Sequence, residues 1–257
     1  MDNSKYYEEF DWDNFTDASE NFKTLLRLIP NEVKSILDIG CGNGLITNPL
    51  GESGFEVTGV DRSAAALKNV KTAKIQCDCN SIPVEDDSFD LVLSSELLEH
   101  LEPKLYEETV AEIKRTAKKY VLLSVPNDES LSKGIIECPE CKTRFHRCYH
   151  MHTFTPERLA KDFNGFKLVE SLTFGFRVRT YNNTLARIKQ KVSKPENWIP
   201  LYRTKNEARK AFCPKCEHSF VYPYKFNFLA TGIDALNIVV TKKKPFHLVV
   251  LLERVEG

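Results

Sequence analysis

Residues 35–45, which read SILDIGCGNGL, decide the fold. The apolar residues at the start are typical of a buried parallel strand, and the run after Asn43 is typical of a helix. Three glycines at alternate positions permit a sharp turn and a close approach of a ligand to the backbone. The free N–H groups at the start of the helix would face the same ligand. The stretch therefore predicts a strand–turn–helix unit that binds a nucleotide-like ligand.

The spacing of the glycines differs from that of dinucleotide-binding proteins. Their third glycine follows the second by three residues, and Leu45 occupies that position here. Asp38 would repel a pyrophosphate, whereas it suits a ligand with a cationic end. The pattern D-x-G-x-G-x-G resembles motif I of the class I S-adenosylmethionine-dependent methyltransferases. The resemblance implies that Asp38 helps hold the methionine end and that Gly40, Gly42 and Gly44 admit the rest of the cofactor.

Two further predicted strands also end in acids. Residues 55–61 lead to Asp61, whose carboxylate can accept both ribose hydroxyls, and residues 74–78 lead to Asp78. The resemblance implies that Asp78 reaches the adenine amino group, and residues 82–101 resemble the family's fourth strand and the segment after it. One such acid alone is typical of a solvated strand end, but three successive ones indicate a cofactor site. The predicted cofactor-binding residues are Asp38, Gly40, Cys41, Gly42, Gly44, Asp61, Arg62, Asp78, Cys79, Ser95 and Glu96.

The alternation of strands and helices predicts an α/β fold. The resemblance implies a Rossmann-like class I methyltransferase: a seven-stranded, mostly parallel sheet with the seventh strand antiparallel, helices on both faces, and a zinc-bearing insertion. We expect the sixth strand at 166–176 and the seventh at 235–242, whereas residues 248–252 have no place in that sheet. The expected segments are an N-terminal lid or helical segment (1–30), the cofactor-binding core (31–126), a first insertion (127–152), a return to the core (153–176), a second insertion (177–230), and a last strand with a C-terminal tail (231–257).

Two C-P-x-C motifs occur, each typical of a zinc knuckle. Together Cys138, Cys141, Cys213 and Cys216 form the ligand set of a closed, structural zinc site. The gap of 71 residues between the motifs exceeds the usual spacing, so ordinary thiols or two local disulfides remain alternatives, with Cys148 as another possible ligand. Because both motifs follow predicted parallel strands, their insertions emerge at one edge of the sheet and can meet there.

Three histidines cluster after the first motif, at positions 146, 150 and 152. A histidine near its ordinary pKa can act as a general base for a hydroxyl or amine acceptor, although packing is the commoner role of a single histidine. The segment from Phe145 to Thr155 resembles one found in some bacterial and archaeal class I methyltransferases that also carry C-P-x-C. We expect His150 to be the catalytic base, with His146 as the second candidate.

Composition limits the partners. The 36 basic and 36 acidic residues balance, so the whole chain has no general attraction for nucleic acid or anionic membranes. No apolar run is long enough to span a bilayer and the N-terminus is polar, so we expect a cytoplasmic protein without a membrane span. Aromatic residues within the first 20 positions predict either a lid over the cofactor or a frayed tail.

The predicted function is methyl transfer from S-adenosylmethionine to an oxygen or nitrogen of a small-molecule acceptor, with zinc in a structural role. The oligomeric state stays open. One alternative is a thiolate-based methyltransferase for a soft acceptor such as arsenite, which would need three convergent cysteines. Another is a non-catalytic module that binds the cofactor and docks a partner through the insertion.

Overall fold

The computed structural model describes residues 8, 12, 18–194, 209–222 and 226–255. They belong to two compact units. The core unit comprises the chain up to Asp128, residues 154–176 and the segment from Pro245 onward, and the insertion unit comprises residues 129–153 and 177–244. Among the described residues, no helix has both the length and the apolar character that crossing a membrane requires.

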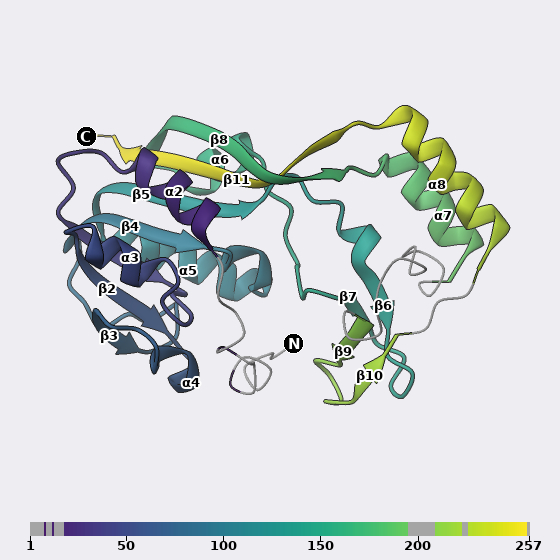
Figure 1. The fold of residues 1–257 in the computed structure, drawn as a ribbon, viewed down its shortest axis with the longest axis horizontal. Helices are drawn as coiled ribbons and strands as arrows, with labels where there is room; N and C mark the ends of the chain where they lie inside the picture. The colour runs from purple at the N-terminus through teal and green to yellow at the C-terminus, as the bar shows by residue number, and fades with distance from the viewer. Residues whose placement is uncertain (1–7, 9–11, 13–17, 195–208, 223–225, 256–257) are drawn as a thin grey trace. The chain divides into compact units, whose positions relative to one another are not determined.

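The core unit is built on a sheet of seven strands (Figure 1). These are β1 (Ser35–Ile39), β2 (Glu56–Asp61), β3 (Ala73–Gln76), β4 (Phe89–Ser95), β5 (Ala117–Pro126), β8 (Phe166–Arg179) and β11 (Lys243–Arg254). Their order is β3-β2-β1-β4-β5-β11-β8. The first five strands pair in parallel, and β11 lies antiparallel to β5. The predicted Rossmann-like class I methyltransferase fold is therefore confirmed.

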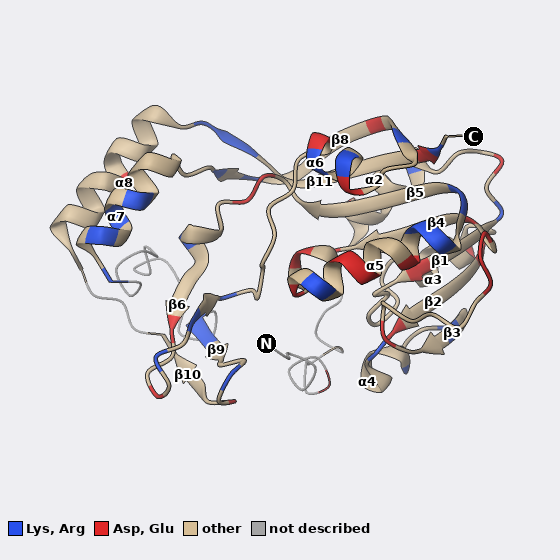
Figure 2. Cartoon of the chain, turned by 180° about the vertical axis from the view of Figure 1, so that it is seen from behind, with Lys and Arg blue, Asp and Glu red and all other residues tan. Residues whose placement is uncertain are grey.

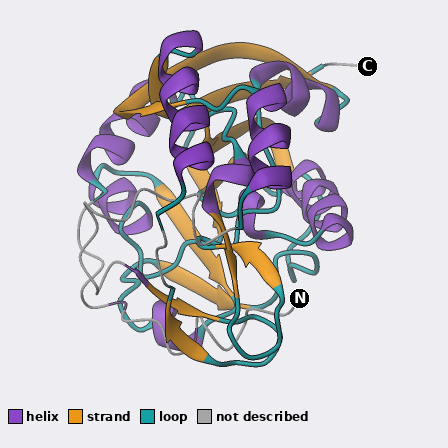
Figure 3. Cartoon of the chain, turned by 90° about the vertical axis from the view of Figure 1, so that its right-hand side faces the viewer, coloured by secondary structure: helices purple, strands orange, loops and turns teal. Residues whose placement is uncertain are grey.

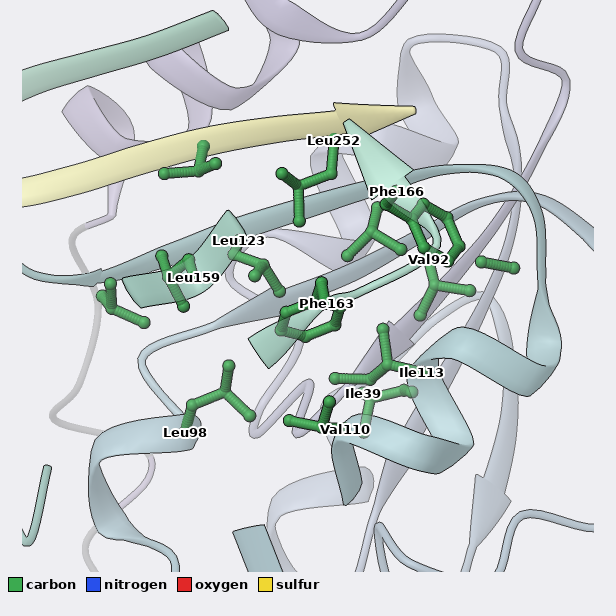
Figure 4. Packing of buried hydrophobic residues seen from close by; sticks show 14 of the residues in the cluster. Ile39, Val92, Leu98, Val110, Ile113, Leu123, Leu159, Phe163, Phe166 and Leu252 are labelled. Atoms are coloured by element: carbon green, nitrogen blue, oxygen red, sulfur yellow. The ribbon is translucent and has the colours of Figure 1, made fainter. Parts of the chain in front are cut away.

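Helices cover both faces of this sheet (Figure 3). They are α2 (Ser19–Leu28), α3 (Thr47–Glu52), α4 (Ala64–Leu67), α5 (Pro103–Thr116) and α6 (Pro156–Asp162). Each inner strand is apolar on both sides, as burial between two helical layers requires. In β4, for example, Val92 faces the layer of α5 and α6, whereas Leu91 and Leu93 face the layer of α2 and α3. Figure 4 shows the first of these layers, where Ile113 and Phe163 pack against strand residues.

The position of the seventh strand is a correction to the sequence prediction. Residues 235–242 lie mostly within helix α8 (Phe228–Val240), whose first turn is capped by Asn227 through a bond from the Ala230 N–H. The antiparallel strand is β11 instead, so residues 248–252 are part of the sheet. Side chains of β11 are buried on both faces, with Val250 in one layer and Val249 in the other. The β-branched residues near Val240 favoured a strand locally, but the cap and the helical packing of α8 determine the outcome.

The described residues of the insertion unit form two short β-hairpins and two α-helices. The first hairpin pairs β6 (Ile135–Glu137) with β7 (Arg144–His146), after a single 3₁₀ turn at Leu131–Gly134. The second pairs β9 (Lys210–Phe212) with β10 (Ser219–Val221). The helices are α7 (Asn183–Val192) and α8, which contact each other.

Candidate functional site

The glycine turn lies at the carboxyl end of β1. Gly40, Gly42 and Gly44 have φ values of 77°, 53° and 83°, which favour glycine. A Cβ at Gly40 would lie 2.9 Å from the side chain of Leu97, so a larger residue would meet both backbone strain and a clash. Cys41 is buried within the turn, and its Sγ lies so near Gly59 that a Cβ there would be 2.8 Å from it. The packing of the turn therefore requires glycine both at Gly40, directly after β1, and at Gly59, within β2.

Asp61, at the carboxyl end of β2, connects the glycine turn to the next helix. Its Oδ2 accepts a hydrogen bond from the Gly42 N–H at 2.9 Å, and its Oδ1 accepts one from the Ser63 N–H at 2.8 Å. Ser63 caps α4 by accepting from the Ala66 N–H. Burial raises the pKa of Asp61, and the two N–H groups oppose that rise. Each carboxylate oxygen retains a second lone pair, so a further donor such as a ribose hydroxyl can be accepted.

Asp38 is the most deeply buried acid of the turn, with 2% of its surface exposed. Its Oδ2 accepts a hydrogen bond of 2.6 Å from the hydroxyl of Thr47, the first residue of α3. Burial raises the pKa of Asp38 to about 7, the Thr47 hydroxyl opposes the rise, and the nearby charge of Asp61 adds to it. A buried carboxyl group in this state favours a neighbouring cation, because a cation restores the ionised form.

Two described residues of the N-terminal segment contact the core unit here, Trp12 at the glycine turn and Glu8 at the start of α4. The Trp12 carbonyl accepts a hydrogen bond from the Asn43 side chain at 2.8 Å, and the Trp12 ring lies 3.0 Å from where a Cβ on Gly42 would be. Glu8 accepts a bond of 3.1 Å from the Ala64 N–H at the start of α4. The other aromatic residues of the predicted lid, Tyr6, Tyr7, Phe10 and Phe15, lie outside the described residues, so the lid stays a prediction.

The remaining predicted cofactor residues lie at the ends of β3 and β4. Asp78 is exposed and forms an ion pair of 3.5 Å with Arg62. The next residue, Cys79, accepts a hydrogen bond from the Thr109 hydroxyl through its sulfur. Ser95 accepts one from the Asn21 side chain. All four belong to the core unit together with the glycine turn.

Glu96 follows β4 in a left-handed conformation, with φ of 55°. Its Oε1 accepts a hydrogen bond of 3.2 Å from the Ser124 hydroxyl and lies 3.1 Å from His247 Nδ1. These contacts join the ends of β4, β5 and β11. The sequence prediction placed Glu96 beside the cofactor, and the structure assigns it these three-strand contacts.

The four cysteines of the two motifs meet within the insertion unit. Their Sγ atoms all lie within 4.8 Å of one another. Cys138 Sγ is 3.6 Å from Cys216 Sγ, and Cys141 Sγ is 3.5 Å from Cys213 Sγ. These distances exceed a disulfide bond of about 2.05 Å. They approach the sulfur–sulfur separation of about 3.8 Å that follows from tetrahedral zinc with bonds of about 2.3 Å.

The two motifs are structural repeats of one another. In each, the N–H of the first cysteine bonds to the carbonyl five residues later, that of Thr143 or of His218. In each, the residue after the second cysteine is left-handed, with φ of 59° at Lys142 and 57° at Glu217. The phenylalanine seven residues after each first cysteine packs edge-to-face on its counterpart, with ring centroids 6.4 Å apart. Both knuckles thus share one hairpin design.

Glu129 joins the two candidate catalytic histidines of the insertion unit. His150 Nδ1 forms a hydrogen bond with Glu129 Oε2, and His146 Nε2 lies 3.7 Å from Glu129 Oε1. The two imidazole rings stack with centroids 4.9 Å apart. Burial would raise the pKa of Glu129, but the hydrogen bond and charge of His150 lower it. Glu129 was absent from the sequence prediction, and its position shortly after β5 was the only available signal.

Backbone contacts distinguish the two histidines. His146 Nδ1 accepts a hydrogen bond from the His150 N–H at 3.3 Å, so the neutral ring carries its proton on Nε2, toward Glu129. Burial lowers the pKa of His146 to about 4. A Cβ at Gly134 would lie 1.9 Å from His146 Nε2, so this glycine makes room for the ring. With one nitrogen accepting and the other protonated, His146 is a poor metal ligand and a poor base at neutral pH.

The methyltransferase domain family model matches residues 37–124, which contain the glycine turn and the acids at the strand ends. Curated relatives match over similar lengths of sequence. Ubiquinone biosynthesis O-methyltransferase of Paramagnetospirillum magneticum is 37% identical over 83 residues, which are 28% of this chain and 32% of that protein. The mitochondrial enzyme of the same name from Arabidopsis thaliana is 35% identical over 120 residues, covering 41% of this chain and 34% of that protein. The chain thus spans about a third of the length of these relatives.

Solved structures agree on the fold. An S-adenosylmethionine-dependent methyltransferase from Archaeoglobus fulgidus superposes with a TM-score of 0.56 at 20% identity, covering 97% of this chain and all of that one. One from Mesorhizobium loti gives a TM-score of 0.53 at 18% identity, with coverage of 93% and 99%. Together with the glycine turn and the sheet order, these matches show that residues 37–124 form a methyltransferase domain and that the core unit has the fold of S-adenosylmethionine-dependent methyltransferases.

Proposed function

We propose that the chain transfers a methyl group from S-adenosylmethionine to an oxygen or nitrogen of a small-molecule acceptor. The observation that carries the proposal is the arrangement of Asp38 and Asp61 around the glycine turn, with Asp78 at the next strand end. The relatives named ubiquinone biosynthesis O-methyltransferase favour an oxygen nucleophile and a small acceptor. Charge balance over the whole chain supports a small molecule over a nucleic acid.

Each residue around the turn has a proposed role toward the cofactor. Bound S-adenosylmethionine would supply an electrophilic methyl group, so no nucleophilic residue of the protein is needed. Asp38 faces the cationic methionine end, Asp61 accepts the ribose hydroxyls, and Asp78 accepts from the adenine amino group. Gly42 keeps the backbone open to the ligand. The contribution of the protein is therefore orientation and exclusion of water.

Replacing Asp61 tests the cofactor site. Asp61→Asn keeps the shape but removes one acceptor oxygen and the charge, so we expect affinity for S-adenosylmethionine to fall by about 1–3 kcal/mol. Isothermal titration measures this change. Asp86→Asn is the matched control, because Asp86 is an exposed acid whose partner is Arg115. Equal affinity in the parent and Asp61→Asn would contradict the assignment.

The raised pKa of Asp38 predicts a pH-dependent affinity. Below about pH 7 the free protein holds Asp38 largely protonated. Binding a cation there must release that proton, so affinity should fall up to about tenfold per unit as pH drops from about 7 to about 5.5. Titrations in buffers of different ionisation enthalpy would detect the released proton. Asp38→Asn should reduce the slope of affinity against pH, and a slope equal to that of the parent would refute this role of Asp38.

We infer that His150 is the general base for the acceptor, with Glu129 as its positioning residue. The hydrogen bond between Glu129 and His150 Nδ1 directs proton exchange with an acceptor to Nε2. Ionised Glu129 also stabilises the imidazolium that forms when a proton is accepted. His146, the second candidate, is proposed only to support Glu129, since its pKa is lowered to about 4.

Glu129→Gln tests this pair, because it keeps the size but removes the negative charge. We expect kcat to fall by about 10- to 100-fold, the acidic limb of the pH–rate profile to shift, and cofactor affinity to stay unchanged. His150→Gln should cost at least as much. Glu137→Gln is the control, because Glu137 is a glutamate of the same unit that pairs with Arg144. Parental kcat in both the Glu129 and the His150 variants would exclude the proposed base.

We also propose that Cys138, Cys141, Cys213 and Cys216 hold one structural zinc ion. The support is the near-tetrahedral spacing of the four sulfurs and the matching hairpins on which they lie. Four protein ligands leave no position for water or substrate, so the ion would tie the two insertions together rather than take part in methyl transfer. Because protein ligands fill all four positions, the site also disfavours the alternative of a thiolate site that binds a soft acceptor such as arsenite.

Elemental analysis of the purified protein should find about one zinc per chain. Cys141→Ser should lose it, because a hydroxyl is a poor zinc ligand, whereas Cys148→Ser should keep it, since Cys148 lies outside the four. Removing zinc should increase hydrogen exchange at 135–146 and 210–221 and leave the sheet of the core unit protected. Protein that is free of metal as purified, or disulfides within the pairs, would disprove the site.

The non-catalytic alternative makes a different set of predictions. A cofactor-binding module would show the losses of affinity expected for the variants at Asp61 and Asp38, but no methyl transfer with any acceptor. An assay with radiolabelled cofactor and quinol or catechol acceptors decides between the two, since the relatives methylate in ubiquinone biosynthesis.

A further inference from the structure

Helix α8 exposes an apolar face. Phe228 is 83% exposed and Val239 is 81% exposed, and they lie at opposite ends of the helix. Leu236 and Ile238 are at least half exposed as well. The other large apolar residues exposed on α7 and α8 or beside these helices are Ile188, Val192, Phe226, Leu229 and Val240. Several exposed apolar residues on one helix mark a docking site more often than single exposed apolar residues do.

The side of α8 that contacts α7 carries two polar residues, Asp234 and Asn237, beside the buried Ala230, which departs from the usual arrangement of a surface helix. Asp234 accepts two hydrogen bonds from the buried Lys189 of α7, at 2.6 and 2.8 Å, and one from the Tyr181 hydroxyl. Asn237, only 3% exposed, donates to the Thr180 carbonyl. These bonds fix the orientation of α8 within its unit. The apolar face is therefore held outward by specific polar contacts.

The charge around this face is strongly positive, although the whole chain is balanced. Residues 177–194 and 226–244 contain nine Lys and Arg but only one acid, Asp234, which is already paired with Lys189. Figure 2 shows basic residues on α7 and almost none of either sign on α8. Lys242 and Lys243 follow the end of α8 directly and are exposed. The balanced total thus conceals a local patch that attracts anions.

We propose that the packed pair of helices α7 and α8 binds the surface of an anionic lipid bilayer. The apolar face of α8 would enter the interface while the surrounding Lys and Arg contact lipid phosphates. With 13 residues, α8 is about 20 Å long, too short for a hydrocarbon core of about 30 Å, so it lies along the surface. Aliphatic side chains at its centre favour lipid over nucleic acid, which binds through basic and stacking groups. The inference goes beyond methyl transfer and does not depend on it.

Co-sedimentation of the full chain with vesicles tests the proposal. We expect binding to vesicles of phosphatidylcholine with phosphatidylglycerol, weak binding to phosphatidylcholine alone, and loss of binding as salt rises from about 0.05 to about 0.5 M. Phe228→Ser combined with Val239→Ser should weaken binding by at least about tenfold. Leu168→Ser is the control, because Leu168 is 41% exposed on β8 in the core unit.

A charge-reversal pair completes the experiment. Lys242→Glu with Lys243→Glu should weaken binding to the anionic vesicles by at least about tenfold, whereas Lys161→Glu on α6 should not. Unchanged helical circular dichroism and unchanged hydrogen-exchange protection of α7 and α8 would show that each variant keeps the insertion unit folded. Failure of the parent to sediment overturns the proposal, as does equal sedimentation of the Phe228 and Val239 variant. Light scattering that shows a parent dimer, converted to monomer by that variant, would instead assign the face to a second copy of the chain.

Discussion

The hydrogen bonds accepted by the Asp61 carboxylate are the constraint on which the proposed cofactor site depends. One oxygen accepts a hydrogen bond from the N–H of Gly42, and the other accepts one from the N–H of Ser63. The carboxyl end of β2 thereby determines both the shape of the glycine turn after β1 and the start of α4. Because an unpaired N–H in a tight turn is costly, the acid stabilises the backbone before any ligand is present. One residue thus serves both the fold and the site.

Much of the core unit could be predicted from local pattern. The glycine turn, the acids at the strand ends and helix α5 all lie within short stretches. In these stretches the hydrophobic periodicity and the turn-forming residues indicate the same secondary structure. The last strand could not be predicted in the same way. Residues 235–242 have the β-branched composition of a strand, yet α8 is decided by the Asn227 cap and by the ion pair of the half-buried Asp234 with the buried Lys189. A tertiary contact overrode the local propensity there.

The candidate residues of the insertion unit show a similar division. The motif itself predicted the cysteine cluster, since two knuckles provide a complete ligand set and need only meet. The role of Glu129 could not be read from the sequence, because it depends on a loop that brings the carboxylate to His150, 21 residues away. Likewise, the contrast between His146 and His150 depends on the burial of His146, which lowers its pKa, and on a backbone N–H that determines its tautomer. Spacing locates such groups but does not distinguish between them.

The path of the chain at the edge of the sheet has an evolutionary consequence. Strands β8 and β11 extend past the points where the second segment of the insertion unit, residues 177–244, begins and ends. The chain leaves and re-enters the core at neighbouring points, since the rings of Phe176 and Phe246 stack with centroids 4.8 Å apart. Sequence added between such points lengthens an existing hairpin and requires no new crossing of the sheet. Sequence between these two points can therefore be gained, exchanged or lost in evolution while the register of the sheet is inherited unchanged.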